Sequence, residues 1–564
     1  MKRRKIAYST MVLLLLAVCC IVGCTPKTTV VSSADEAAPV RAKMDDVLTE
    51  YMPDVSPEAG DWLMLHLSVE MPHLNPLTST DAYASELESW IFDTLIDRDP
   101  VTMENIPHAA SSWEISEDHL KYTFHLRQDI LFSDGEPLTA DDVKFTYDML
   151  MDPKVDAPHL RSYFNEVTAC EVLDEYTVCF TCTKPYYRHL VMLGGLSIMP
   201  RHIYGEGDFN KHPNNRAPVG SGMYRLEMWE TGQQITLSRN PHYWGMKEKG
   251  LPHFDKIVYA IITDDNTAFQ VMSRGDIDFM GMPAETFVRR ANTKKFKEKF
   301  NRFAYSRPVY TYIGWNSRKP MFADKTTRLA LTMLLDRQLI CDEIYYGQAQ
   351  VISGNFMANT PEHNNAVTPV PFDPKEAVKL LTKAGWNSGS DGTLEREGVR
   401  FSFEVSTTIQ NPVSEKVLTV YKEELARVGI ELIIRPMEWA SLLEQVDSRG
   451  FDATLMGWVM PPDPDPYQVW HSSQADAGSN HIGFINEESD RVIEEARVEF
   501  DRDKRIVLYH RFQEILHEEQ PYLFLLAPKS LAAGDKRIHG IRVYPFGVEQ
   551  RYWFVPRVQQ RYGK

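Results

Sequence analysis

The chain has 564 residues, of which 43% are hydrophobic, 25% are charged and 11% are aromatic. Its formal net charge of −17 at pH 7 excludes the basic face that nucleic-acid binding requires. A chain of this length is too long for one hydrophobic core, so we expect a soluble globular protein with two or more domains.

The first 23 residues have the layout of a secretory signal peptide. Four positive residues at 2–5 precede an apolar run at 11–22, which is too short to cross a bilayer core of about 30 Å. The run ends at Gly23-Cys24, and small residues before a cysteine resemble a bacterial lipobox, in which the thiol carries a diacylglycerol. We therefore predict lipid attachment at Cys24 and an extracytoplasmic location. An ordinary signal peptide with an incidental Cys24 is the alternative.

A flexible tether is expected at 24–58, where Thr, Ser, Val, Ala and acidic residues dominate and aromatic residues are almost absent. Beyond it, apolar periodicity predicts short strands and amphipathic helices. We expect a strand at 62–67, a helix at 84–95, a strand at 120–126 and a helix at 140–150. Thr139 and Asp142 have the spacing of a capping box for the last of these helices.

Four cysteines follow the lipobox. Residues 167–172 and 176–181 predict two strands in a register that places Cys170 opposite Cys179. In an oxidising compartment these two residues could form a cross-strand disulfide, and two buried free thiols are the alternative. Cys179 and Cys182 have CxxC spacing, but residues three apart on a strand face opposite ways, so we expect no metal site there.

The second half of the chain continues to alternate helices and strands. We expect a strand at 234–238, helices at 264–274, 326–346 and 374–384, and a strand at 401–407. The next four elements are a helix at 413–428, a strand at 430–435, a helix at 439–449 and a strand at 453–458. This last run predicts an α/β layer with parallel strands.

Motifs of the common enzyme classes do not occur in the sequence. It contains no GxSxG elbow, HExxH zinc helix, GxxxxGK[ST] phosphate loop or GxGxxG dinucleotide loop. His517-Glu518 begins like HExxH, but Pro521 occupies the position of the second histidine. The sequence therefore predicts a protein that is not an enzyme and that holds no cofactor or metal.

Short blocks from residue 61 to the C-terminus carry a resemblance to a known family. They are 74–77 (LNPL), 113–118 (WEISED), 122–127 (YTFHLR), 132–135 (FSDG), 138–143 (LTADDV), 219–224 (VGSGMY), 239–244 (RNPHYW), 275–278 (GDID) and 457–458 (GW). In this order and spacing they resemble family 5 of the bacterial extracellular solute-binding proteins. That family contains dipeptide-, oligopeptide- and nickel-binding members.

The resemblance implies an α/β fold with two hinged lobes, of the periplasmic-binding-protein type, and an extra domain in the first lobe. For this chain we expect lobe 1 at 59–95, 206–310 and 528–564, the extra domain at 96–205 and lobe 2 at 311–527. Such a protein closes its lobes around a solute and delivers it to the permease and ATPase of an ABC importer. We expect a monomer that its lipid holds at the membrane, in a periplasm or on the outer cell surface.

The resemblance also implies that the cleft between the lobes selects the solute. Trp439 and Trp458 match cleft aromatics of peptide-binding members, with Gly457 beside the second, and a flat aromatic ring gives contact area at little entropic cost. The alternative for both tryptophans is a place in the core. Asn316 could bond a ligand backbone or could hold the end of a strand.

Many peptide-binding members place an aspartate three residues after the second of these tryptophans, where it receives the peptide's ammonium group. This chain has Pro461 at that position. The next acids are Asp463 and Asp465, both candidates for ligand contact. A shifted loop could let Asp463 take the role, because a buried ammonium needs a charged partner. Alternatively, the two acids form an exposed turn and the solute has no free amino terminus. Asp81 and Tyr83 are further candidates for ligand contact.

The sequence thus predicts the substrate-binding component of an ABC importer, with peptide as the solute. Within that class the alternatives are an oligosaccharide, an opine-like compound and a nickel chelate. Outside it, the alternatives are a lipoprotein hydrolase of the cell envelope and a receptor that passes ligand status to a signalling partner.

Overall fold

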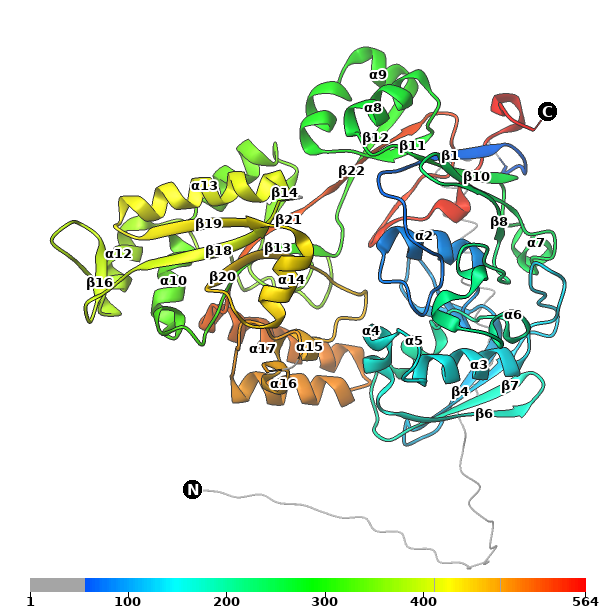
Figure 1. Cartoon of the computed structure of the whole chain (residues 1–564), viewed down its shortest axis with the longest axis horizontal. Helices are drawn as coiled ribbons and strands as arrows, with labels where there is room; N and C mark the ends of the chain where they lie inside the picture. Colours follow the sequence, from blue (N-terminus) through cyan, green and yellow to red (C-terminus); the bar gives the residue numbers. More distant parts are fainter. Residues whose placement is uncertain (1–55, 410, 477, 564) are drawn as a thin grey trace, which may run out of the picture.

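The computed structural model describes residues 56–409, 411–476 and 478–563. The predicted signal peptide, Cys24 and most of the predicted tether lie outside these residues. Figure 1 shows that the chain forms two bodies. The first body holds a seven-stranded and a four-stranded sheet, and the second holds a six-stranded sheet. Helices pack against these sheets, so the fold is mixed α/β.

The seven-stranded sheet is the centre of the first body. Its strands follow the order β12 (Phe300–Tyr305), β22 (Ser530–Asp535), β11 (Phe279–Gly281), β1 (Trp62–Leu67), β10 (Lys256–Ile261), β9 (Gln234–Arg239) and β8 (Tyr224–Glu230). In β1, Leu63, Leu65 and Leu67 alternate with less buried residues and are at most 2% exposed. One face of the strand is therefore buried in the core. The strand predicted at 62–67 is confirmed.

The four-stranded sheet lies below the first one in Figure 1. Its order is β4 (Ala110–Ile115), β5 (Lys121–Leu126), β7 (Thr177–Cys182) and β6 (Val167–Asp174). Helix α3 (Ala140–Met151) contacts β6 and β7. It begins with the predicted capping box, because Asp142 accepts a hydrogen bond from the backbone N–H of Thr139 at 2.9 Å.

Other helices and two small sheets complete the first body. The helices are α2 (Ala82–Ile91), α4 (Pro158–Arg161), α5 (His189–Gly194), α6 (Arg201–Tyr204), α7 (Gly245–Lys249), α8 (Asp265–Arg274) and α9 (Lys294–Lys299). The small sheets pair β2 (Ile96–Arg98) with β3 (Asn105–Pro107), and β23 (Val543–Tyr544) with β24 (Gly547–Val548).

The six-stranded sheet of the second body has the order β14 (Ala349–Val351), β21 (Tyr522–Pro528), β13 (Val309–Trp315), β20 (Ala453–Val459), β18 (Ser402–Thr408) and β19 (Glu431–Met437). Strand β18 pairs in parallel with both β19 and β20. Helix α13 (Pro412–Arg427) links β18 to β19, and α14 (Trp439–Asp447) links β19 to β20. The parallel α/β layer predicted from residues 413–458 is therefore confirmed.

The remaining elements of the second body surround this sheet. They are α10 (Lys325–Met333), α11 (Arg337–Leu339), α12 (Pro374–Lys383), α15 (Tyr467–Trp470), α16 (Glu487–Val498), α17 (Arg502–Glu519) and a small sheet of β15 (Asn387–Ser388), β16 (Leu394–Arg396) and β17 (Val399–Arg400). Of all the helices in the part of the chain that the structure describes, none has the length and apolar character to span a bilayer.

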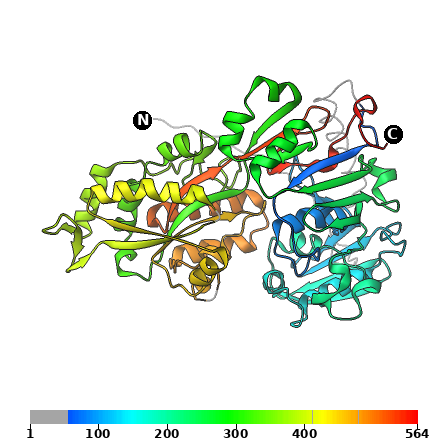
Figure 2. The ribbon, with the colours of Figure 1, turned by 45° about the horizontal axis from the view of Figure 1, so that its top comes forward.

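Two crossing segments join the bodies. Residues 306–308 connect β12 to β13, and Lys529 connects β21 to β22. The segments lie side by side, because β12 pairs with β22 in the first body and β13 pairs with β21 in the second. Figure 2 shows this narrow connection from a second direction. Two adjacent extended segments are a geometry that allows hinge motion between the bodies.

The prediction of one continuous helix at 326–346 is wrong. Helix α10 ends at Met333, and a new short helix begins where the Asp336 side chain accepts a hydrogen bond from the backbone N–H of Leu339. A π-helical turn, Ile340–Ile344, follows it. Continuous apolar spacing concealed the interruption, because the capping aspartate lies within the periodic pattern.

The disulfide that the sequence leaves possible between Cys170 and Cys179 is not formed. Cys170 lies opposite Phe180, and Cys179 lies opposite Glu171. Irregularities near both ends of β6 shift the register by one residue, which turns a side chain to the other face of the sheet. The cysteines of the described residues are buried free thiols, the alternative that the sequence left open. Burial raises the pKa of the Cys170 thiol to about 12, so this thiol stays protonated.

A buried ion cluster closes the first body around the C-terminal segment. The Arg537 guanidinium binds Asp278, with Nε at 2.8 Å from Oδ1, and also binds Asp61. The side chains of Arg537, Asp61 and Asp278 are 4%, 0% and 1% exposed. Arg561 adds a more exposed contact to Asp535 at 2.9 Å. The cluster ties β1, the residue before β11 and the segment after β22 together.

Candidate ligand-binding cleft

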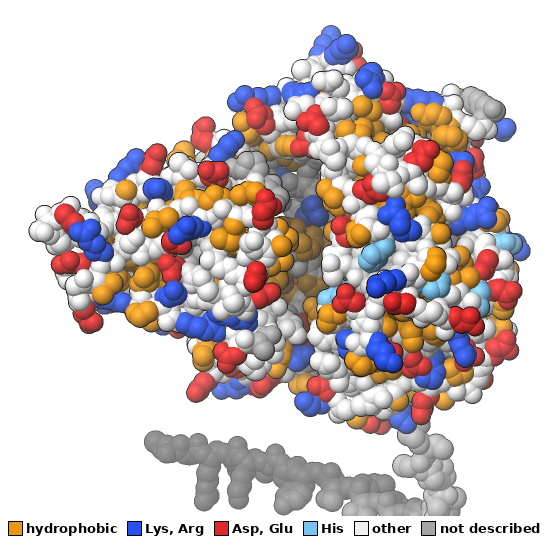
Figure 3. All heavy atoms as spheres, viewed as in Figure 1, with side chains coloured by type: hydrophobic (Ala, Val, Ile, Leu, Met, Phe, Trp, Pro, Cys, Tyr) orange, Lys and Arg blue, Asp and Glu red, His pale blue; other side chains and the backbone are white. Residues whose placement is uncertain are grey.

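A recess separates the two bodies on the face shown in Figure 3. On the side of the first body, a cavity of about 1130 Å³ is lined by α2, by the loop that follows it and by ends of the central strands. Tyr305 and Arg307, at the crossing, and residues 546–551 near the C-terminus also line it. Pockets for drug-sized molecules measure roughly 300–1,000 Å³, so this cavity has room for a larger ligand.

Helix α2 forms one wall of the cavity. The helix begins at Asp81, whose carboxylate accepts a hydrogen bond from the backbone N–H of Tyr83 at 2.8 Å. Tyr83, Glu86 and Trp90 line the cavity. Tyr259 orders two of them, because its hydroxyl donates to Glu86 at 3.1 Å and accepts from Trp90 Nε1 at 2.9 Å. Burial in the recess raises the pKa of Glu86.

Paired charges lie beside this wall. Arg551 binds Asp97, and His108 Nε2 lies 2.9 Å from Asp93. Burial raises the pKa of Asp97, but Arg551 and His108 outweigh that effect and hold the pKa well below its ordinary value. Both carboxylates therefore have cationic or imidazole partners within the protein.

Glu88 has no such partner. Its side chain lines the cavity, the residue is 5% exposed, and Oε1 has no hydrogen-bond partner among the described residues. Burial, with a smaller effect from nearby Asp81, raises the pKa of Glu88 to about 8. At neutral pH this carboxyl group is therefore mostly protonated.

Glu88→Gln should change how stability depends on pH. The pKa of Glu88 is about 8 in the folded chain and near its ordinary 4.5 in the unfolded chain. At a pH between these two values, the folded state therefore carries a proton on Glu88 that the unfolded state has lost. As the pH rises from 5 to 8, the free energy of unfolding of the wild type should therefore fall by up to about 1.4 kcal/mol per pH unit. That of Glu88→Gln should not show this fall. Urea unfolding at several pH values measures this difference. The exposed Glu298→Gln is the control, and parallel pH profiles for Glu88→Gln and wild type would refute the prediction.

Strand β20 carries a half-buried tryptophan, Trp458, which packs against the core of the second body and does not line the large cavity. Met456, Trp458 and Met460 alternate along one face of the chain, and Met460 lines a second cavity at the crossing. Trp458 is half-buried, and its ring is parallel to Tyr312 with a centroid distance of 6.5 Å. Tyr312 in turn stacks on Tyr522 at 3.8 Å. The stack holds the Trp458 ring in one orientation.

The bodies touch directly at one side of the recess. Tyr186 Oη, in the first body, donates to Asp465 at 2.6 Å, and Arg497 lies 3.2 Å from the same carboxylate. Tyr187 Oη donates to the backbone oxygen of Pro464 at 2.7 Å. We call the contact formed by Tyr186, Tyr187, Pro464, Asp465 and Arg497 the interbody contact. It joins segments almost 300 residues apart in the sequence.

Comparison with known proteins identifies the family. The family described as bacterial extracellular solute-binding proteins, family 5, middle region, matches residues 104–480. The chain belongs to this family. It is 30% identical to the oligopeptide-binding protein AppA of Bacillus subtilis over 561 residues, which cover 97% of each chain. The predicted family and the predicted α/β fold class are thereby confirmed.

Solved structures of related proteins share the fold. The B. subtilis oligopeptide-binding protein AppA in complex with a nonapeptide superimposes with a TM-score of 0.76 and 28% identity, over 89% of this chain and 100% of that chain. NikZ from Campylobacter jejuni in complex with Ni(L-His) gives a TM-score of 0.73 and 24% identity, over 88% and 99%. The second likeness shows the fold alone, so the fold does not select the ligand.

The predicted site residues of this family 5 protein lie in different settings. Trp439 begins α14 and is 47% exposed, whereas Gly457 is exposed on β20. Tyr83 lines the large cavity, with its hydroxyl 2.6 Å from Ser68 Oγ. Asn316 is 1% exposed, and its amide donates to the backbone oxygen of Phe451 at 2.8 Å. These contacts match the strand-end role that the sequence left open, and Asn316 lines neither cavity.

Asp463 and Asp465, two candidate ligand-binding residues, bind protein side chains in this structure. Asp463 pairs with Arg98 of the first body, and Asp465 is held in the interbody contact with a 7% exposed side chain. The sequence could not reveal these pairs, because the partners lie hundreds of residues away. In the arrangement shown, both carboxylates therefore connect the bodies.

Tyr186→Phe should open the two bodies. The substitution removes one hydrogen bond to the Asp465 carboxylate, and a bond to a charged group contributes about 1.5–3 kcal/mol. We expect the population in which the bodies touch to fall at least tenfold relative to the open one. Spin-label distances between the bodies measure the two populations. Tyr163→Phe, an exposed tyrosine of the first body, is the control, and an unchanged distance distribution in Tyr186→Phe would contradict the prediction.

Proposed function

We propose that the chain is the peptide-binding component of an ABC importer. The observation that carries this proposal is the cavity of about 1130 Å³ beside the recess, which exceeds the roughly 300–1,000 Å³ of drug-sized pockets. Its wall combines aromatic rings with carboxyl groups on α2, which suits a long ligand with varied side chains. The likeness to an oligopeptide-binding protein over almost the whole chain supports the same solute class.

Capture proceeds by hinge closure in this proposal. The first body corresponds to lobe 1 with its extra domain at 96–205, and the second corresponds to lobe 2 at 311–527. A peptide that contacts α2 on one side and the Trp458 surface on the other binds the closed form more tightly than the open form. It therefore shifts the population toward closure. The closed protein then docks on the permease, and the ATPase drives import.

The location proposed for this protein rests on the sequence. Cleavage before Cys24 and lipidation of its thiol would anchor the folded body at the membrane through the segment 24–58. Cleavage removes four positive residues and no acidic ones, so the net charge changes from −17 to −21. Because such a surface is repelled by anionic lipid headgroups, the lipid itself must hold the monomer at the membrane.

A thermal-shift screen followed by calorimetry tests the proposal. The purified chain is mixed with peptide pools of two to ten residues, with oligosaccharides and with nickel–histidine. We expect only the peptide pools to raise the midpoint of thermal unfolding, because a ligand that binds the folded state alone stabilises it. A rise with sugar or nickel–histidine but not with peptide would refute the peptide assignment and retain the family role.

A further inference from the structure

The large cavity beside α2 has an acidic lining. Among the described residues, six carboxyl groups line it, together with the guanidinium groups of Arg307 and Arg551. The carboxyl groups are those of Glu86, Glu88, Asp93, Asp97, Asp265 and Glu549. Because the acids outnumber the cations, the electrostatic potential inside the cavity favours a ligand that carries a positive charge.

Half of these carboxyl groups have partners inside the protein. Arg551 binds Asp97 and also binds Glu549 at 3.0 Å, and Asp93 lies 2.9 Å from His108 Nε2. The other half have no cationic partner within 4.0 Å in the described part of the chain, and these are Glu86, Glu88 and Asp265. The negative charge of the cavity is therefore only partly balanced by the protein.

Glu86 offers an accessible carboxylate oxygen to a ligand. The residue is exposed on α2, one helical turn after Tyr83, and both side chains line the cavity. Its Oε1 accepts hydrogen bonds from Tyr259 Oη at 3.1 Å and from Gln550 Nε2 at 3.5 Å. Its Oε2 makes no hydrogen bond within the described residues. One oxygen therefore fixes the carboxylate, and the other can bind a cation of the ligand.

Two buried acceptor atoms of the cavity lining lack a donor. Glu88 is 5% exposed, and neither its Oε1 nor Gln550 Oε1 has a hydrogen-bond partner among the described residues. Burial raises the pKa of Glu88 to about 8, because no cation of the protein offsets it. Since both oxygens are buried in the wall, they attract a cation without contacting it. A wall rich in acceptors is complementary to groups that only donate, such as lysine ammonium and arginine guanidinium.

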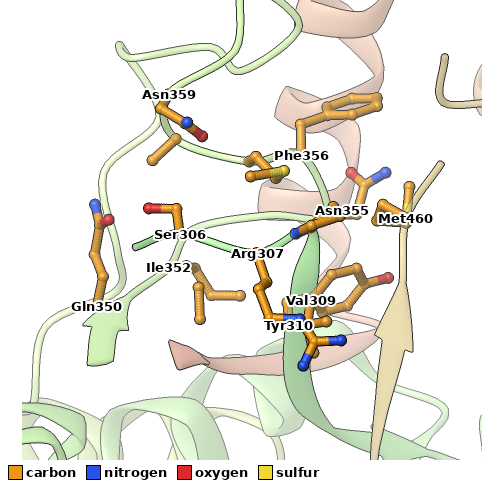
Figure 4. Close-up of a pocket in the computed structure, with 14 residues that line it drawn as sticks. Ser306, Arg307, Val309, Tyr310, Gln350, Ile352, Asn355, Phe356, Asn359 and Met460 are labelled. Atoms are coloured by element: carbon orange, nitrogen blue, oxygen red, sulfur yellow. The ribbon is translucent and has the colours of Figure 1, made fainter. Parts of the chain in front are cut away.

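Arg307 does not supply the missing cation. It lies on the crossing segment, where it also lines the smaller cavity (Figure 4). Its charge acts on the pKa of Glu86 only at longer range, because no carboxylate of the described residues lies within 4.0 Å of its guanidinium. A metal ion is not indicated either, since the described residues contain no group of three or more His, Cys, Asp or Glu side chains that could hold one. The cavity is therefore complementary to an organic cation.

We propose that the large cavity selects peptides that carry a cationic side chain. The ammonium group of a lysine or the guanidinium group of an arginine binds Glu86 Oε2, and the ring of Tyr83 packs against the same side chain. The buried oxygens of Glu88 and Gln550 add attraction at longer range. The inference rests on the proposed peptide-binding function and adds the class of side chain that the bound peptide contains.

Glu86→Gln tests the cation site. Three libraries of pentapeptides contain one lysine, norleucine or glutamate at any position of an otherwise uncharged sequence with free ends, and calorimetry compares their affinities. Norleucine has the length of lysine without its charge. Wild-type protein should bind the lysine library at least about tenfold more tightly than the norleucine library, and the glutamate library most weakly. Glu86→Gln should bind lysine and norleucine with affinities within about twofold of each other.

Glu423→Gln is the matched control. Glu423 is an exposed residue of α13 in the second body and does not line the cavity, so this variant should keep the wild-type preference for lysine. Equal affinity of the wild type for the lysine and norleucine libraries would overturn the proposal.

The norleucine library also separates a side-chain cation from the N-terminal ammonium group. Both libraries have free amino termini, so a site that binds the terminus cannot prefer lysine. If Glu86→Gln weakens both libraries equally, Glu86 binds the terminus or maintains the shape of the cavity, and the side-chain site is wrong. If no library binds to the wild type, the proposed peptide-binding function fails as well, which distinguishes the two failures.

Glu88→Gln tests the attraction by the buried acceptors. This variant should reduce the preference for lysine by about threefold, which is less than in Glu86→Gln, because the Glu88 carboxyl group must lose its proton before its charge acts on the ligand. Its affinity for norleucine should equal that of the wild type, which shows that the cavity is intact. A loss of preference as large as that in Glu86→Gln would overturn the assignment of the contact to Glu86.

Discussion

Arg537→Met is expected to lower the free energy of unfolding of the first body by about 3–5 kcal/mol, because it leaves two buried carboxylates without their cation. Asp61 and Asp278 are at most 1% exposed, and each binds the Arg537 guanidinium. Water can hydrate neither carboxylate unless the sheet opens. Hydrogen exchange of the β1 amides, together with urea unfolding, measures the loss.

Arg561→Met is the matched control for this prediction. Arg561 approaches the same cluster through Asp535 at 2.9 Å, but its side chain is 36% exposed. Because the Arg561 side chain keeps contact with water while that of Arg537 does not, this variant should lose clearly less stability than Arg537→Met. Equal losses in Arg537→Met and Arg561→Met would show that burial of the cluster does not determine its contribution.

Trp458→Ala should have a large effect on peptide binding. We expect the affinity for the peptide pools to fall by about 10–100-fold, since a well-packed aromatic anchor contributes about 2 kcal/mol or more. The ring is fixed by its stack on Tyr312 and by an Nε1 hydrogen bond to Tyr522 Oη at 3.4 Å. A fixed ring loses little entropy when a ligand packs on it. Calorimetry measures the change in affinity.

Two other tryptophans separate this effect from a general loss of an aromatic residue. Trp439→Ala tests the exposed candidate on α14 and should weaken binding less, because no aromatic stack is found around that ring in the described residues. Trp229→Ala, on the outer strand β8, should leave affinity unchanged. Wild-type affinity in a folded Trp458→Ala variant would remove this residue from the site.

Local patterns in the sequence were enough to predict much of the fold. The four elements between residues 413 and 458 begin and end within two residues of their expected bounds. They were predictable because helix and strand periods differ clearly there and each element has one buried face. The expected capping box at Thr139 and Asp142 is a local signal of the same kind.

Features that depend on distant residues could not be predicted in this way. The register of Cys170 against Cys179 changed because of strand irregularities that leave no sequence signal. The sequence leaves open whether Asp463 and Asp465 face a ligand or form an exposed turn, and their partners Arg98 and Tyr186 lie 365 and 279 residues away. Nothing local marks such pairs.

The polar groups of the candidate site were missed for a related reason. Arg307 lies in a segment without helical or strand periodicity, and it lines the large cavity because the chain crosses between the two bodies there. A charged residue just before a proline was the only local hint, at Arg307-Pro308. Glu88 was concealed because it lies on an otherwise apolar helix face.

A crystal structure of the chain with a bound peptide from the stabilising pools tests the central claim most directly. The account predicts peptide density in the recess, in contact with α2 of the first body and with Trp458 of the second. Peptide density on an outer surface, or a peptide that contacts only one body, would contradict capture between two hinged lobes.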